Sequence, residues 1–96
     1  MKQQRPPTHP GGILKRLYLQ PLKLSTIDLA DAIGVSRKTI SKLINQRGAV
    51  TVEMALRLSI AFNTTPQLWL NLQQTYDLWH AQRTAKGLKN VRKFAA

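Results

Sequence analysis

The segment from Leu29 to Asn45 constrains the fold more than any other part of the chain, because two helical patterns flank a glycine in it. On both sides of Gly34 apolar residues recur at three- and four-residue steps, as expected for two helices that each bury one face. Gly34 can adopt the left-handed conformation that ends a helix, and Ser36 can cap the next one. The buried faces are expected to be Leu29, Ala30 and Ile33, then Ile40, Leu43 and Ile44.

The second of these helices has an unusual outer surface. It carries Arg37, Lys38 and Lys42 but no acidic residue, whereas ordinary exposed helix faces mix both charge signs. These cations, with Thr39 and Ser41, can donate hydrogen bonds to phosphate oxygens or to base edges. A helix-turn-helix protein presents such a recognition helix to the major groove of DNA. The alternative is a plain helical hairpin with a solvated face, but the motif and the charge together favour the recognition helix.

The charge of the whole chain also favours a polyanionic partner. Its 96 residues allow one domain with a modest core, and 15 Lys and Arg against 4 Asp and Glu give a net charge of +11. Such an excess repels itself unless a polyanion is bound, so DNA, RNA and anionic membrane surfaces are the candidates. Several of the cations lie near the two ends of the chain, where they raise affinity without adding sequence specificity.

Several other classes of function are disfavoured by the composition. Without cysteine the chain has no disulfide or thiolate metal site, and His9 and His80 are too far apart in sequence to suggest a metal site. Scattered acids and the lack of a nucleophile motif or phosphate-binding loop disfavour an enzyme. We therefore expect no metal, no cofactor and no small-molecule ligand. No apolar run reaches membrane-spanning length and no signal peptide is recognisable, so we expect a cytoplasmic protein without a membrane partner.

Start and stop signals divide the rest of the chain into helices. Pro10 suits the first turn of a helix that Pro21 ends, and Ser25–Asp28 resembles a capping box at the start of the next helix. Thr51 can cap a fourth helix, and Thr65, followed by a proline, can open a fifth. The sequence thus predicts an all-α fold of five helices. Apolar surface on the fourth helix is expected from Met54, Leu56, Leu58, Ala61 and Phe62.

We expect a single domain from residue 9 to residue 86. A flexible N-terminal arm, residues 1–8, precedes it, and a basic flexible tail, residues 87–96, follows it. Within the domain the helix-turn-helix spans about residues 26–45 and a long C-terminal helix spans about residues 66–85.

The long C-terminal helix carries an apolar band that is wider than a short core needs. Trp69, Tyr76 and Trp79 contribute to it, and the second half of the helix extends past what a small core can cover. We predict that these rings form a homodimer interface, since helix-turn-helix proteins usually bind paired half-sites. The alternative is that the aromatic residues fold back onto the first helix.

A set of short motifs follows in order along the chain, and its first and sixth members are the most distinctive. They are His9-Pro10-Gly11, Leu29-Ala30, Gly34-Val35-Ser36, Thr39-Ile40-Ser41, Met54-Ala55-Leu56-Arg57-Leu58, Pro66-Gln67-Leu68-Trp69-Leu70-Asn71-Leu72-Gln73 and Tyr76-Asp77-Leu78.

With these motifs the chain closely resembles the HigA-type antitoxins, a branch of the Xre and lambda-repressor-like helix-turn-helix superfamily, over about residues 9–80. The resemblance implies a lambda-repressor-like domain that dimerises, binds a palindromic operator in double-stranded DNA and represses its own toxin-antitoxin operon. It also implies a HigB-type mRNA-cleaving toxin as a partner. Base-reading positions fall on Arg37, Lys38 and Lys42, and phosphate-contacting positions on Thr26, Asn45 and Arg47. The candidate DNA-binding residues are Thr26, Ser36, Arg37, Lys38, Thr39, Ser41, Lys42, Asn45 and Arg47.

The chain departs from the family pattern in two ways. Gly12 stands where members usually have glutamate, and the net charge gives no long-range attraction to a basic toxin. Toxin binding would then need an apolar interface or an acidic patch from Asp28, Asp31, Glu53 or Asp77. The main alternative is a stand-alone transcriptional regulator without a toxin, and the reading frame beside the gene distinguishes the two. RNA binding is disfavoured because the few aromatic residues lie on an apolar helix face.

Overall fold

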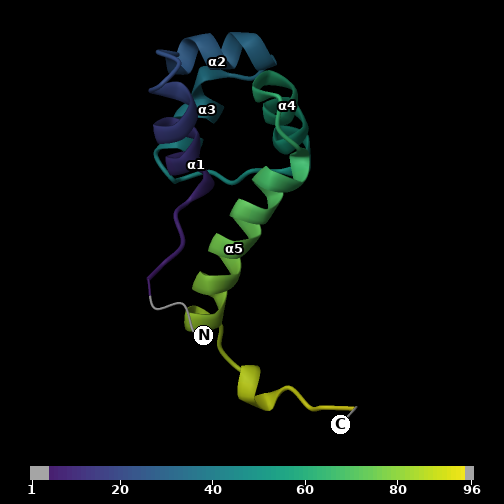
Figure 1. Cartoon of the computed structure of the whole chain (residues 1–96). Helices are drawn as coiled ribbons and strands as arrows, with labels where there is room; N and C mark the ends of the chain where they lie inside the picture. The colour runs from purple at the N-terminus through teal and green to yellow at the C-terminus, as the bar shows by residue number, and fades with distance from the viewer. Residues whose placement is uncertain (1–4, 95–96) are drawn as a thin grey trace.

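The computed structural model describes residues 5–94, and every regular element in that part of the chain is a helix (Figure 1). Because α1 and η1 follow each other without a break, they form one helix. Together with α2, α3, α4 and α5 it confirms the predicted all-α fold of five helices. The elements are α1 (Pro10–Ile13), the π-helix η1 (Leu14–Leu19), α2 (Thr26–Ile33), α3 (Arg37–Ile44), α4 (Val52–Phe62), α5 (Pro66–Thr84) and the 3₁₀ turn η2 (Leu88–Asn90).

The helix starts follow the predicted capping chemistry. At α2 the Ser25 hydroxyl accepts from the Asp28 amide at 3.0 Å, and the Asp28 carboxylate accepts from the Ser25 amide at 2.9 Å, which completes a capping box. The bond from the Ser25 amide, and after it the Ser25 side chain, hold the pKa of the Asp28 carboxyl group below its usual range. Thr51 and Thr65 cap α4 and α5 in the same way. Pro10 occupies the first turn of α1, where its missing N–H is not needed.

The first helix widens into π geometry, which the sequence did not predict. The amide of Gln20 donates to the carbonyl of Lys15 at 2.9 Å, a five-residue step instead of the usual four. Leu14 and Leu19 of this helix lie in the core, but Leu17 is 62% exposed.

The core lies between the first helix, α2, α3, α4 and the start of α5, and Trp69 is its largest fully buried side chain. The indole N–H of Trp69 donates to the Thr64 hydroxyl at 2.8 Å, and its ring packs against Tyr18 and Phe62. The prediction that Trp69 lies at a dimer interface is therefore wrong. The beginning of α5 packs against α4, and this contact turns position 69 inward.

Helix α4 is less buried than its sequence suggested. Met54 and Leu58 lie in the core and Phe62 is half-buried, as predicted, but Leu56 and Ala61 are exposed. The reason is helical geometry, because positions 54 and 58 share the inner face while position 56 lies on the opposite side.

Helix α5 projects out of the four-helix bundle (Figure 1). The molecule therefore measures 50 × 25 × 24 Å. Tyr76 is half-buried and meets the His9 ring edge-on at 4.7 Å, so this ring does fold back toward the first helix. Trp79, also half-buried, packs against His80 and lies 3.9 Å from the Arg83 guanidinium.

The two ends of the chain are described in part. As far as residue 94, the tail after α5 contains one 3₁₀ turn, η2, and leads away from the bundle (Figure 1). The ends of the predicted arm and tail, residues 1–4 and 95–96, lie outside the described part of the chain. No helix among the residues from 5 to 94 has the length and apolar character to cross a membrane.

Candidate nucleic-acid interface

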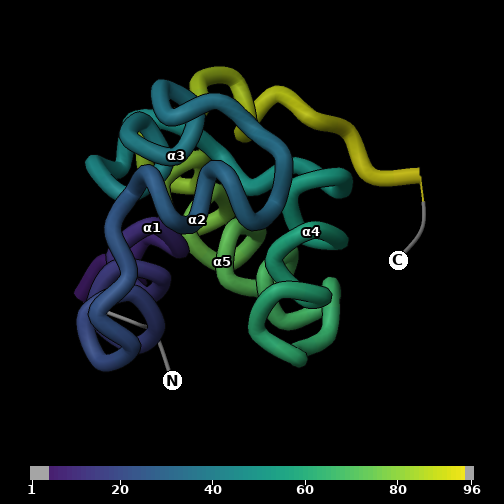
Figure 2. Tube along the Cα trace, turned by 90° about the horizontal axis from the view of Figure 1, so that it is seen from above, coloured from purple at the N-terminus to yellow at the C-terminus, as the bar shows by residue number. Residues whose placement is uncertain are grey.

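The turn between α2 and α3 is built as the sequence predicted. Gly34 has a left-handed φ of 73°, and its amide donates to the Ala30 carbonyl at 3.0 Å. The hydroxyl of Ser36 accepts from the Thr39 amide at 3.1 Å and so caps α3. In Figure 2, α2 and α3 lie together on one side of the bundle. The local sequence thus fixes the angle at which α3 leaves the turn.

The two faces of α3 have different chemistry. Ile40 and Leu43 point into the core and are 0% and 2% exposed, while Arg37, Lys38 and Lys42 are exposed on the outside. In the part of the chain that the structure describes, none of these three cations is in an ion pair, since the one salt bridge found there joins Glu53 and Arg57. Their charge is therefore available to an external anion.

Polar side chains next to these cations have partners within the helix. The Thr39 hydroxyl lies 2.8 Å from the Ser36 hydroxyl, so the two hydroxyls are hydrogen-bonded to each other. The Thr39 methyl group can still make an apolar contact, for example with a thymine methyl. Ser41 is half-buried, and its hydroxyl accepts weakly from the Asn45 amide group at 3.4 Å. Ser36 and Thr39 therefore help to shape the helix start.

The loop after α3 begins with a tight helix termination. Gln46 takes a left-handed φ of 63°, and the amides of Arg47 and Gly48 both donate to the Lys42 carbonyl, at 2.8 and 3.1 Å. Asn45 and Arg47 are exposed on this loop. The nine predicted DNA-binding residues thus lie at the start of α2, at the N-cap of α3, on α3 or on the loop that follows it. Thr26 is half-buried at the first position of α2.

Two buried side chains, for which the sequence predicted no role, form hydrogen bonds with the backbone of this loop. His9, 3% exposed, donates from Nε2 to the Gly48 carbonyl at 2.9 Å, and its Nδ1 accepts from the Gly11 amide at 2.9 Å. Gln73 accepts from the Val50 amide at 2.8 Å. Both residues belong to distinctive sequence motifs, but their partners are 39 and 23 positions away, and no local pattern encodes such contacts.

The hydrogen bonds of His9 define its protonation. A carbonyl only accepts, so Nε2 carries the proton and Nδ1 is the acceptor in a neutral ring. Burial lowers the pKa of His9 below its usual range, against the weaker opposing effects of the Gly48 carbonyl and the Asp77 charge. His9 therefore stays neutral at pH 7.

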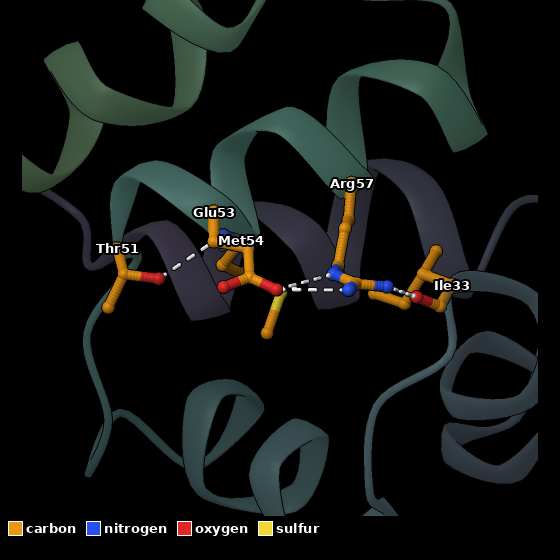
Figure 3. Close-up of polar contacts among 5 residues, drawn as sticks. All are labelled: Ile33, Thr51, Glu53, Met54 and Arg57. Atoms are coloured by element: carbon orange, nitrogen blue, oxygen red, sulfur yellow. Dashed lines mark hydrogen bonds and ion pairs between the residues drawn. The ribbon is translucent and has the colours of Figure 1, made fainter.

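A third side chain, Arg57, supports the end of α2, just before the turn that leads to α3. Arg57 of α4 donates from Nη1 to the Ile33 carbonyl at 2.6 Å, in the last turn of α2, and pairs with Glu53 at 2.9 Å (Figure 3). A guanidinium at a helix C-terminus satisfies an orphan carbonyl and interacts favourably with the helix dipole. Arg57 was part of a predicted motif, but the sequence gave it no role.

The described residues form no cluster of potential metal ligands. In residues 5–94 no three His, Cys, Asp or Glu side chains lie close enough together to hold an ion. What the surface of α3 and its loop offers is a set of unpaired cations and hydrogen-bond donors on a rigid support, which is suited to binding a polyanion.

Known proteins with similar sequences and structures bear on this surface. Residues 14–69 match the family model described as helix-turn-helix. An uncharacterized HTH-type transcriptional regulator of Haemophilus influenzae is 44% identical over 91 residues, which are 92% of this chain and 85% of the relative. Antitoxin HigA-1 of Vibrio cholerae is 42% identical over 78 residues, 81% of this chain and 73% of the relative. The solved structure of the antitoxin GraA in complex with its operator is 38% identical, with a TM-score of 0.88 over 100% of this chain and 99% of that one. These matches confirm the resemblance drawn from the motifs.

Proposed function

Because this chain belongs to the helix-turn-helix family and is related to the HigA antitoxins, we propose that it is a sequence-specific DNA-binding antitoxin that represses its own operon. It acts as a homodimer on a palindromic operator in the cytoplasm and catalyses no reaction. The observation that carries the proposal is the outer face of α3, where Arg37, Lys38 and Lys42 are exposed without counter-ions on a helix that is fixed by its cap and its buried face.

The roles of these residues follow from their chemistry. Arg37 and Lys38, in the first turn of α3, can hydrogen-bond guanine O6 and N7 in the major groove. Thr26, Asn45 and Arg47, on either side of that helix, contact phosphates and fix the orientation of the protein on DNA.

A footprint on the DNA upstream of the gene tests the proposal. The wild-type protein should protect one palindromic stretch, and Lys38→Ala should abolish that protection at the same concentration. Lys15→Ala is the matched control, because Lys15 is equally cationic and exposed but lies on η1. Equal loss in both variants, or protection without a defined boundary, would show that net charge alone binds DNA.

The dimer in this proposal forms through the outer half of α5. A groove of about 480 Å³ runs along this helix, and Leu78 in it is 54% exposed. Since Trp69 is in the core, the interface comprises this groove with Tyr76 and Trp79 at its side. Sedimentation should show a dimer that Leu78→Glu converts to a monomer. The groove is lined by Val50, Leu70, Gln73, Gln74, Asp77, Leu78 and Ala81.

Toxin binding, in this proposal, uses the face formed by α2 and α4, which pack together at the top of Figure 1. Val52, Leu56 and Ile60 repeat every four residues along α4 and are 64%, 48% and 83% exposed, which is unusual for aliphatic side chains. Asp28 and Asp31 on α2 and Glu53 on α4 are also exposed. Three of the four acids thus lie on the two helices of this face, and with the apolar stripe of α4 they complement a basic toxin.

Co-expression with the product of a neighbouring reading frame, where that frame encodes a small basic protein, tests this part. Ile60→Glu should prevent co-purification of the two proteins, while Lys38→Ala should leave it intact and lose only DNA binding. A stand-alone regulator is the second candidate, favoured by the similarity to the Haemophilus influenzae regulator. It would be established if DNA binding is specific and no neighbouring frame encodes such a protein.

A further inference from the structure

The segment from Asn45 to Val50 connects the recognition helix α3 to α4 and carries two of the predicted phosphate contacts, Asn45 and Arg47. Surface loops are in general more mobile than the helices they connect, and a mobile loop makes weak contacts with DNA because ordering it opposes binding. Its start is fixed by the bonds to the Lys42 carbonyl. The Gly48 carbonyl and the Val50 amide make no such local bond, so what holds this end of the loop must come from elsewhere in the chain.

Two polar side chains supply that support from opposite ends of the sequence. His9 donates to the carbonyl of Gly48, and Gln73 accepts from the amide of Val50, at 2.9 and 2.8 Å. His9 and Gln73 are 3% and 7% exposed, so both bonds are shielded from water.

Each of these side chains is itself held in place. The Nδ1 atom of His9 accepts from the Gly11 amide, and its ring meets Tyr76 of α5 edge-on. The Nε2 of Gln73 donates to the Asp77 carboxylate at 2.9 Å, one turn further along α5. The loop is thereby tied to the start of α1 and to α5, the helix of the proposed dimer interface.

We propose that His9 and Gln73 are positioning residues for DNA binding, which hold the loop after the recognition helix so that Asn45 and Arg47 meet the DNA backbone. This inference rests on the proposed function, since it assigns a task to side chains behind the same surface. Neither residue needs to touch DNA, because each acts through the backbone of the loop.

The two ring nitrogens of His9 allow its two tasks to be separated. In His9→Asn the side-chain oxygen occupies the place of Nδ1 and still caps α1, but nothing reaches Gly48. In His9→Gln the amide nitrogen occupies the place of Nε2 and still donates to Gly48, while the cap is lost. Both variants lose the ring against Tyr76, and each keeps one of the two bonds. Because His9→Asn keeps the cap, weaker DNA binding by His9→Asn than by His9→Gln is explained by the lost bond to Gly48 and not by the cap.

Affinity for the upstream DNA across a salt series is the readout. His9→Asn should bind about tenfold more weakly than His9→Gln, with a salt slope smaller by about 1, the value for one lost phosphate contact. Equal affinities and slopes in the two variants would overturn the proposal, because a merely structural role does not change the number of phosphate contacts.

Gln73→Met tests the second support in the same assay. Gln67→Met is its control, since Gln67 is exposed in the first turn of the same helix and lies outside the groove of the proposed dimer interface. Gln73→Met should show the reduced slope and Gln67→Met should not. Hydrogen exchange of the amides from Arg47 to Val50 should be measured without DNA. It should be at least about tenfold faster in His9→Asn than in His9→Gln, and at least about tenfold faster in Gln73→Met than in its control variant. Unchanged exchange would overturn the proposal even if DNA binding changed. Failure of the wild-type protein to prefer its own upstream DNA would instead count against the proposed function, and the exchange data would still decide whether the loop is held.

Discussion

The carbonyl oxygen of Leu43, in the last turn of the recognition helix, occupies the space that a β-carbon on Gly11 would need. The backbones of α1 and α3 therefore touch directly at this point, and only glycine permits that approach. This contact gives a physical reason for each residue of the opening motif. His9 caps the helix and reaches the loop, Pro10 starts the first turn, and Gly11 lets α1 pack against α3.

Gly11→Ala should destabilise the protein by about 3 kcal/mol, because the new methyl group would have to displace backbone atoms of α3. Gly12→Ala is the control within the same helix. Its β-carbon would meet the Thr8 methyl at 3.3 Å and the Arg16 guanidinium at 3.5 Å, and both groups can shift. Alanine there should stabilise by roughly 0.5–1 kcal/mol through helix propensity.

Thermal denaturation of the two variants checks whether their stabilities change in opposite directions. A stable Gly11→Ala protein would mean that the contact between the α1 and α3 backbones is not close. A large loss in Gly12→Ala would mean that the first helix tolerates no side chain at either glycine, and the distinction drawn between them would be wrong.

The local parts of this fold were predictable from sequence because they depend on residues close together in the chain. Ser25, Ser36, Thr51 and Thr65 cap the helices that they were predicted to cap, and Gly34 makes the predicted turn. Each of these contacts spans three or four positions, which is the distance over which capping chemistry is readable.

The errors and omissions concern contacts between distant segments. Trp69 was assigned to a dimer interface because an aromatic band on a long helix does not reveal which part the core covers. The roles of His9 and Gln73 could not be predicted, because their bonds to Gly48 and Val50 join residues that are far apart in the sequence. The candidate DNA-binding residues could be named from the sequence because an exposed basic face on a short helix is a local property, and their contacts with DNA stay a prediction.

Acidification should destabilise the protein through His9. The pKa of this histidine is lowered by burial in the folded state, whereas in the unfolded chain it is about 6.5. The unfolded state therefore binds more protons below pH 6.5, and the stabilisation present above that pH is lost as the pH falls through the lower folded pKa. Melting curves at several values between pH 7.5 and 5 should show this loss in the wild type and a smaller one in His9→Gln. The same pH dependence in both proteins would assign it to other groups.

Arg57 should stabilise the helix-turn-helix more through α2 than through its ion pair. Arg57→Met keeps the packing of the stem but removes the bond to the Ile33 carbonyl, and should lower the free energy of unfolding by about 1–2 kcal/mol. Glu53→Gln removes only the charge of an exposed partner and should change it by less than about 0.5 kcal/mol. Denaturant unfolding distinguishes the two, and equal losses would mean that the ion pair is the important contact.

Base-reading and backbone-contacting residues should fail in different ways. Lys38→Ala should weaken binding to the operator by roughly 1–3 kcal/mol and relax the preference at one base pair. Arg47→Ala should weaken binding to all DNA sequences about equally and reduce the salt slope by about 1. Competition with single-base operator variants, repeated at several salt concentrations, measures both quantities. A uniform loss in Lys38→Ala would remove this residue from the base-reading set.

The most direct test of the whole account is the affinity of the wild-type protein for its own upstream DNA and for a scrambled sequence, measured across a salt series. Specific recognition by α3 predicts a preference of about a thousandfold or more that persists at physiological salt. Equal affinities that fall together as salt rises would mean that the charge of +11 alone attracts DNA, and would contradict the assignment of α3 as a recognition helix.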